Sequence, residues 1–176
     1  MKIEDNYLPE KAFKFIFDII SGEDFPWFYQ SFAERSDNMD ILLTHLFMNH
    51  NPLRPSDWMN LLEPLIEKIN PNALIRIKAN SYPCTTTIQE HKMHTDFQFK
   101  CTTSIFYLNT NNGITKFGDG RICESVANRL LTFETTMPHC STSCTDVSVR
   151  YNINFNYFGK DDEISRRNTP PIITEM

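Results

Sequence analysis

The first part of the chain contains two stretches whose hydrophobic residues repeat with the spacing of an α-helix. In residues 9–20 the large apolar side chains fall on one face, and Pro9 suits a first helical turn. Residues 56–69 form a second stripe of this kind behind Ser56, which is a favourable N-cap. Pro64 either kinks this second helix or opens a new one. Both stretches predict amphipathic helices that cover one face of a sheet.

The segment between these two stretches shows no clear period. Residues 24–29 are aromatic and interrupted by a proline, a composition that favours packing in the core over a substrate-binding surface. Residues 45–55 look irregular, so His45 and His50 are interpreted as ordinary loop residues. We therefore expect residues 1–72 to be a helical support for the rest of the chain.

From residue 73 onward the hydrophobic pattern changes from helical to alternating, which predicts β-strands. Asn, Asp and Gly gather at 109–113 and at 119–120, where they indicate turns. The expected strands are 73–82, 84–90, 101–108, 114–117, 121–126, 130–135 and 147–157. So many short strands favour a mainly β fold, a jelly-roll or cupin-like double-stranded β-helix flanked by the helices.

The length of 176 residues is that of a single domain, with residues 73–159 as its core. Residues 160–176 are charged and contain two adjacent prolines, so we expect a flexible tail.

The net charge of −5 argues against a broad nucleic-acid-binding surface, although a small basic groove for nucleic acid is still possible. No apolar run is long enough to cross a membrane, and the acidic start lacks the pattern of a signal peptide. We expect a soluble, cytoplasmic protein.

The triplet His94-Thr95-Asp96 is the first candidate for chemistry. In an extended segment His94 and Asp96 face the same side about 6.5 Å apart, so both can reach one ion through bonds of about 2.1 Å. His91 has the wrong parity and would point to the other side. His139 would add a third ligand. Two histidines and one carboxylate are the facial ligand set of non-haem Fe(II) oxygenases, although an isolated triplet of this kind also arises by chance.

The cysteines offer a second possible metal site. Their odd number of five and their irregular spacing favour free thiols in a reducing compartment. Cys140 and Cys144 nevertheless follow His139 closely, and these three side chains could bind zinc. A convincing fourth zinc ligand is lacking. We therefore favour a loop with free thiols beside the metal site formed by the triplet and His139.

Strand 147–157 alternates in an informative way, because its odd positions are large and mostly apolar while its even positions are polar. Strand 74–82 repeats this pattern. The polar faces are either exposed to solvent or line a barrel mouth, and the nearby ligand candidates favour the barrel mouth. Arg150 then lies inside a pocket, where a guanidinium indicates an anionic ligand such as a carboxylate. The alternative is a salt bridge with Asp146, the nearest acid in the sequence.

These motifs resemble those of the Fe(II)/2-oxoglutarate-dependent dioxygenases, and within them the prolyl 4-hydroxylase-like branch. The resemblance covers about residues 74–159, and the order of the pieces makes it specific although each piece alone is weak. The pieces are Ser81-Tyr82-Pro83, His94-Thr95-Asp96, Thr103 to Asn109, Gly113 to Phe117 with Asp119-Gly120, Asn128 to Phe133, Pro138-His139 and Arg150 to Asn154. The chain is also similar in size to small oxygenases of bacteriophages. The first 70 residues carry no family motif, which leaves the substrate open.

The resemblance implies three Fe(II) ligands, namely His94, Asp96 and His139. It further implies that Arg150 binds the distal carboxylate of the cosubstrate 2-oxoglutarate. The implied reaction uses O2 to hydroxylate a C–H bond and releases succinate and CO2, with ascorbate as a supporting reductant. Iron supplies the oxidative chemistry, and the protein positions the reactants.

Further residues would bind the cosubstrate if the resemblance holds. Tyr82 and Tyr107 would donate their hydroxyls to 2-oxoglutarate, unless they are aromatic residues of the core. Asn152 and Asn154 are weaker candidates for the same role than the two tyrosines.

The substrate expected from the resemblance is a peptidyl or free amino acid, of the prolyl type. Two other functions stay open. One is oxidative demethylation of nucleic acid, which the acidic net charge disfavours. The other is a cupin-like module that binds a metal without catalysis. The presence of all three ligands together with Arg150 argues against such a module.

Overall fold

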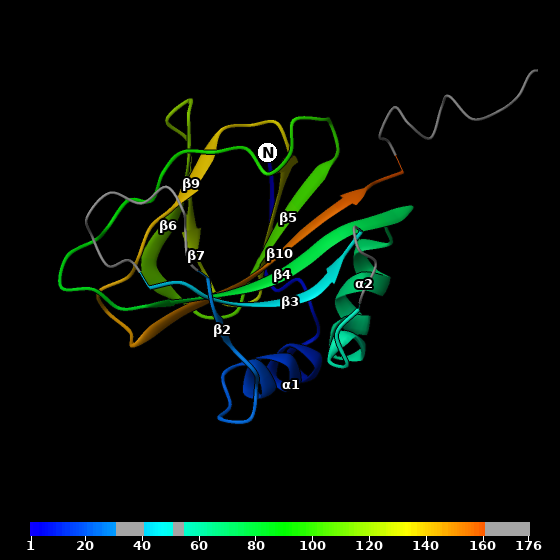
Figure 1. Ribbon diagram of the computed structural model, residues 1–176, viewed down its shortest axis with the longest axis horizontal. Helices are drawn as coiled ribbons and strands as arrows, with labels where there is room; N and C mark the ends of the chain where they lie inside the picture. The colour runs from blue at the N-terminus through cyan, green and yellow to red at the C-terminus, as the bar shows by residue number, and fades with distance from the viewer. Residues whose placement is uncertain (31–40, 51–54, 161–176) are drawn as a thin grey trace, which may run out of the picture.

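The computed structural model describes residues 1–30, 41–50 and 55–160. The predicted flexible tail, apart from Lys160, lies outside this part of the chain. Within it, the strands form two antiparallel sheets (Figure 1). The larger sheet has the strand order β1 (Lys2–Glu4), β8 (Arg129–Glu134), β5 (Thr102–Tyr107), β10 (Val149–Phe158), β4 (Ala73–Pro83), β3 (Leu43–Asn49), β2 (Phe28–Tyr29). The smaller sheet has the order β7 (Ile122–Ser125), β6 (Asn111–Phe117), β9 (His139–Ser141).

The two sheets face each other and enclose the interior of a double-stranded β-helix, as the sequence predicted. Between them lies a cluster of buried residues from β5 and β8 on one side and β6 and β7 on the other. Its members are Ile105, Tyr107, Phe117, Cys123, Leu131 and Phe133. Phe117 and Phe133 meet edge to face at 5.0 Å between ring centroids, which fixes the spacing of the sheets at this point.

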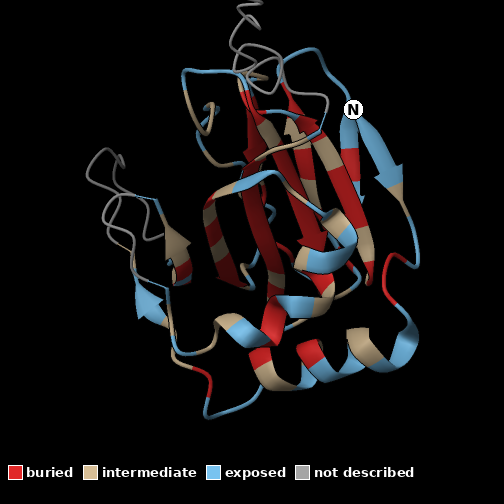
Figure 2. Cartoon of the chain, turned by 90° about the vertical axis from the view of Figure 1, so that its right-hand side faces the viewer, coloured by how far each residue is buried: buried red, intermediate tan, exposed pale blue. Residues whose placement is uncertain are grey.

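The helices cover the outer face of the larger sheet, where they complete a second and larger apolar core (Figure 1). They are α1 (Glu10–Ile20), a short 3-10 helix η1 (Met59–Leu62) and α2 (Glu63–Ile69). Pro64 stands in the first turn of α2, so it opens a second helix and does not kink a continuous one. Figure 2 shows the long central strands as mostly buried, whereas the helices bury one side and expose the other.

Two local predictions were wrong. Residues 45–49 were expected to be irregular but belong to β3, which pairs with β4. In this strand the side chains of His45 and Phe47 are buried. The expected strand at 84–90 is irregular, because its backbone finds other partners: the N–H groups of Cys84 and Thr85 donate to carbonyls of residues 148 and 144. The short strands β1, β2 and β9 were not predicted.

In the described part of the chain, no helix is both long enough and apolar enough to cross a membrane.

His45 makes the stability of the fold depend on pH. It is buried between Phe25 and Phe47, its Nδ1 donates to the Pro26 carbonyl at 2.8 Å, and its Nε2 accepts from the Ser56 hydroxyl at 2.8 Å. Burial, partly opposed by the bond to Pro26, lowers the pKa of His45 below its ordinary value. The unfolded state therefore binds more protons below about pH 6.5, so the free energy of unfolding falls as the pH is lowered.

When the pH is lowered from about 7.5 to about 5.5, we expect the free energy of unfolding to fall less in His45→Gln than in the wild-type protein. Urea denaturation at each pH measures this free energy. The exposed His50 provides the matched control, and His50→Gln should keep the wild-type pH dependence. Equal pH dependence in all three proteins would contradict the role assigned to His45.

Candidate metal centre and its polar surroundings

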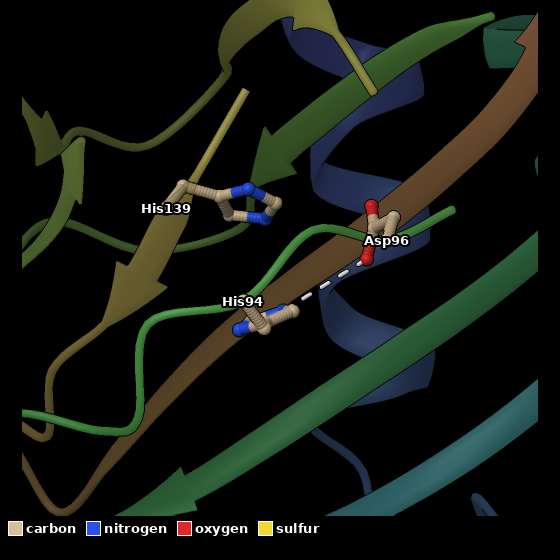
Figure 3. Close-up of side chains that lie close together, drawn as sticks. All are labelled: His94, Asp96 and His139. Atoms are coloured by element: carbon tan, nitrogen blue, oxygen red, sulfur yellow. Dashed lines mark ion pairs between the residues drawn. The ribbon is translucent and has the colours of Figure 1, made fainter. Parts of the chain in front are cut away.

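The side chains of His94, Asp96 and His139 come together, with His139 projecting from β9 (Figure 3). One potential ligand atom from each lies within 4.8 Å of the other two. The Asp96 carboxylate is buried, with 5% of its side chain exposed, and His139 is buried as well. The side chain of His94 is 51% exposed and forms the open side of the group. In the described ranges, these three side chains form the single group of this composition that could hold a metal ion.

Backbone hydrogen bonds bring the two histidines together although 45 positions separate them in the sequence. His94 N–H donates to the His139 carbonyl and His139 N–H donates to the His94 carbonyl, both at 2.9 Å. His94 lies in an irregular segment outside the strands, and the spacing of two residues places His94 Nε2 3.9 Å from Asp96 Oδ1. A single bridge of two strand-like hydrogen bonds is therefore enough to assemble the group.

The orientation of both imidazole rings leaves the same nitrogen free. His94 Nδ1 lies 3.1 Å from the Lys92 carbonyl, and His139 Nδ1 lies 3.0 Å from the Met137 carbonyl. A carbonyl only accepts, so Nδ1 carries the proton in each neutral ring and Nε2 offers its lone pair. Burial lowers the pKa of His139, which favours this neutral, metal-binding form.

Asp96 accepts hydrogen bonds from four side chains. Arg76 Nη2 donates to Oδ1 at 3.0 Å, while Oδ2 accepts from Asn156 at 2.8 Å, Asn154 at 3.1 Å and Thr103 at 3.2 Å. Burial alone raises the pKa of Asp96, but the Arg76 charge and the amide donors outweigh it and lower the pKa to about 2. The carboxylate is thus ionised and oriented before any ion binds.

The polar faces predicted for the two strands lie opposite each other. In the antiparallel register of β4 and β10, Tyr82 pairs with Arg150, Asn80 with Asn152, Lys78 with Asn154 and Arg76 with Asn156. Alternate residues in the middle of both strands, namely Ile77, Ala79, Ile153 and Phe155, belong to the apolar core under the helices. The polar residues therefore line the barrel interior, in agreement with the barrel-mouth interpretation, and they form a row that starts at Arg150 and ends at the Asp96 carboxylate.

Arg150 is fully buried and has no acidic partner in the described part of the chain. Its Nε donates to Ser125 Oγ at 2.8 Å, and its Nη1 donates to Ser141 Oγ at 2.7 Å. Nη2 is buried without a hydrogen-bond partner. The alternative salt bridge with Asp146 does not form, because that carboxylate accepts from the backbone N–H of Asn112 at 3.0 and 3.1 Å. A buried cation with an unused donor indicates a missing anion.

Gly113 provides the space for Arg150. A Cβ atom at this position would lie 2.6 Å from Arg150 Cδ and 2.8 Å from the Ser143 carbonyl oxygen. No side chain fits so close to two groups that are themselves packed.

The two tyrosines named from the sequence flank the same guanidinium. The carbon at the centre of the guanidinium lies 5.2 Å from the Tyr82 ring centroid and 5.8 Å from that of Tyr107. The Tyr107 hydroxyl is 2.7 Å from Thr115 Oγ1, and burial raises the pKa of Tyr107, so this hydroxyl keeps its proton. Asn152 lies farther along the row and accepts from Asn80 at 2.9 Å.

Sequence inspection missed the groups that hold Asp96, namely Arg76, Thr103 and Asn156. Their strand parity was visible, since Arg76 and Asn156 fall on the polar faces of their strands. What the sequence did not show is that β4, β10 and β5 are neighbours, with Arg76 opposite Asn156 and Asn156 opposite Thr103.

The zinc alternative gains no support. Cys140 and Cys144 are buried free thiols, and neither joins the group around His139. Burial raises the pKa of both thiols, which disfavours the thiolate that binds zinc. The prediction of free cysteines is in agreement with the structure for all five.

Comparison with known proteins gives similarity of fold without similarity of sequence. No family model and no curated protein matches the sequence. A prolyl hydroxylase of Trichoplax adhaerens, solved with a peptide fragment of the oxygen degradation domain of hypoxia inducible factor, matches with a TM-score of 0.59 and 16% identity over 96% of this chain and 87% of its own.

Two further solved structures match over 89% of this chain. A prolyl-4-hydroxylase of Pseudomonas putida gives a TM-score of 0.57 at 12% identity over 91% of its own length. SnoN, a non-heme α-ketoglutarate-dependent epimerase of nogalamycin biosynthesis, gives 0.62 at 10% identity over 77% of its length. At these identities the likeness concerns the fold.

We predict that His94→Ala reduces the affinity for Fe(II) by more than about 100-fold, since it removes a direct ligand and not merely the partner of one. Anaerobic calorimetric titration with Fe(II) measures this effect. His91→Ala is the matched control, because the His91 ring stacks on Tyr82 with centroids 5.3 Å apart and is not part of the three-ligand group. A loss of stability in His94→Ala with unchanged Fe(II) affinity would show that His94 is structural.

Asn156→Ala should weaken Fe(II) binding by about 10- to 100-fold, the range typical of residues that orient a metal ligand. Its side chain donates to Asp96 and to Thr103 and accepts from Arg76. The same calorimetric titration measures the change. Asn80→Ala is the control on the same polar row, since Asn80 bonds to Asn152 and does not contact Asp96. Equal affinities of the two variants would refute the orienting role.

Proposed function

We propose that this chain, whose fold is that of the prolyl 4-hydroxylase-like Fe(II)/2-oxoglutarate oxygenases, is an Fe(II)- and 2-oxoglutarate-dependent dioxygenase. It would hydroxylate a C–H bond of a peptidyl or free amino acid, with succinate and CO2 as co-products. The observation that carries the proposal is a group of three metal-ligand side chains in the same barrel interior as a buried, incompletely bonded arginine. The peptide bound to the Trichoplax protein supports an amino-acid substrate.

The donor set fits Fe(II). Two imidazole Nε2 atoms and one ionised carboxylate oxygen are the ligands of the facial arrangement, which leaves three positions for other molecules. His94, Asp96 and His139 would hold the ion. The donors to Asp96 and the Nδ1 contacts of both rings fix these ligands in place. The half-exposed side of the group, at His94, would admit the substrate.

The surroundings of Arg150 fit a dicarboxylate. Arg150 Nη1 donates to Ser141, which lies two residues after His139 in β9 and is therefore about 6.5 Å away on the same face. A five-carbon chain with a carboxylate at each end is long enough to join the metal to the guanidinium. Arg150 Nη2 and the hydroxyls of Tyr82 and Tyr107 would bind its distal carboxylate, and Asn152 would be a further polar neighbour.

Bound Fe(II) and 2-oxoglutarate supply the oxidation of a C–H bond by O2, with decarboxylation of the cosubstrate. The protein contributes placement and shielding. Arg150 neutralises the distal carboxylate, Tyr107 keeps its proton for donation, and the apolar cluster between the sheets excludes water from one side of the site. Free thiols at all five cysteines are compatible with the proposed cytoplasmic location, where Fe(II) is also stable.

We predict that anaerobic titration of the Fe(II)-loaded protein with 2-oxoglutarate produces the metal-to-ligand charge-transfer band of a chelated 2-oxo acid. Arg150→Met should raise the concentration needed for half-saturation at least about 30-fold, since removing one partner of a buried charge pair costs about 2–5 kcal/mol. 2-Oxobutyrate, which lacks the distal carboxylate, is the control ligand. Its titration should be similar in the wild-type protein and in Arg150→Met.

Catalysis itself is tested by succinate release in the presence of O2 and ascorbate. Release of succinate distinguishes an oxygenase from a module that binds the metal without turnover. Absence of the band in wild-type protein with iron demonstrably bound would refute the cosubstrate site. A charge-transfer band without release of succinate would show that the protein binds metal and 2-oxoglutarate without catalysis.

A further inference from the structure

Lys78 is a cation on the interior face of β4 for which the proposed iron and cosubstrate sites provide no partner. It pairs in register with Leu46 of β3 on one side and with Asn154 of β10 on the other. Its neighbours on the same face of β4, Arg76 and Asn80, both have hydrogen-bond partners. No residue in the described part of the chain forms a hydrogen bond or ion pair with the Lys78 ammonium.

The surroundings of Lys78 are short of negative charge. Burial lowers its pKa to about 8, and the neighbouring Arg76 contributes to this shift while Asp96 opposes it. Lys78 is half-buried and lies on the face of β4 that carries Arg76 and Asn80, the face that lines the barrel interior. A cation in this position gains most from an anionic ligand.

The excess of positive charge persists when the proposed ligands are added. Of the described acidic residues, all are exposed except Asp96 and Glu4, and Glu4 pairs with Lys2 on the edge strand β1. The two charges of Fe(II) balance those of 2-oxoglutarate, and Asp96 balances one of the interior cations. Two cations then remain in the barrel of a protein whose net charge is −5.

Lys78 lies at the metal end of the interior. Its strand neighbour Arg76 and its cross-strand neighbour Asn154 both donate to the Asp96 carboxylate. Arg150 is paired with Tyr82, two interior positions away from Lys78 and therefore about 13 Å along the strand. Lys78 is thus close to the place where a substrate must present its C–H bond and far from the distal carboxylate of the cosubstrate.

We propose that Lys78 determines substrate specificity by binding a carboxylate of the substrate, so that the substrate is a small carboxylic acid such as a free amino acid and not a residue inside a peptide. An ammonium group binds a carboxylate through its charge and three N–H donors, whereas a peptide bond is neutral. This inference rests on the proposed function, because the charge balance includes Fe(II) and 2-oxoglutarate.

The test compares acids with their neutral amides. Wild-type protein, Lys78→Met and Lys78→Arg receive Fe(II), 2-oxoglutarate, ascorbate and O2 with an equimolar mixture of the common L-amino acids or of their carboxamides. Mass spectrometry then measures the hydroxylated products. We expect the wild type to favour acids over amides at least about tenfold, Lys78→Met to lose this preference, and Lys78→Arg to keep part of it. Lys116→Met is the matched control, because Lys116 pairs with Glu90 on the surface.

Several results would overturn the inference. These are equal hydroxylation of acids and amides by the wild type, hydroxylation of neither mixture, an unchanged preference in Lys78→Met, or better hydroxylation of a peptide with an internal proline. A loss of 2-oxoglutarate affinity in Lys78→Met as large as that in Arg150→Met would instead place Lys78 at the cosubstrate and overturn it too. The charge-transfer band of the wild type is recorded in parallel. Its absence means that the proposed function fails, whereas its presence without acid preference means that only the role of Lys78 fails.

Discussion

The antiparallel pairing of β10 with β4 is the constraint on which the candidate site depends. This register places Arg150 opposite Tyr82 and Asn156 opposite Arg76, so that polar side chains of both strands face the barrel interior. A shift by one residue would turn them toward the helices and bring Ile153 and Phe155 inside. Such a shift would bury polar groups without hydrogen-bond partners, which is costly. The apolar core under the helices and the polar row inside the barrel therefore favour the same register.

The part of the site that the sequence predicts is the part that depends on local spacing. Strand parity placed Arg150 inside the barrel, and the structure finds it buried there with an unused donor. The spacing of two residues also joined His94 to Asp96, although the segment that carries them is not a strand. His91 is outside the three-ligand group as expected, but its ring does not point away from the interior, since it stacks on Tyr82. Two residues of separation are enough for the side chains of His94 and Asp96 to converge outside any strand.

The remainder depends on which strands become neighbours, and one sequence does not contain that information in a local form. Arg76 and Thr103 belong to the surroundings of Asp96 because β4 and β5 both flank β10. His45 was interpreted as a loop residue because residues 45–55 show no regular hydrophobic pattern. Its ring is buried between Phe25 and Phe47, and its nitrogens form hydrogen bonds with two distant groups, the Pro26 carbonyl and the Ser56 hydroxyl. Long-range partners of this kind are invisible to periodicity.

The charges of the interior imply that the proposed metal and the proposed cosubstrate would strengthen each other's binding. Arg76, Lys78 and Arg150 would repel a dication, and among the acidic residues that the structure describes only Asp96 opposes them in the interior. A dianionic cosubstrate removes that repulsion, while the metal in turn offers the anion a direct bond. Because coupling between two ligands is reciprocal, each should raise the affinity of the other by the same factor. An anionic substrate would extend this coupling to a third ligand, since it would meet the positive charge that the first two leave uncompensated.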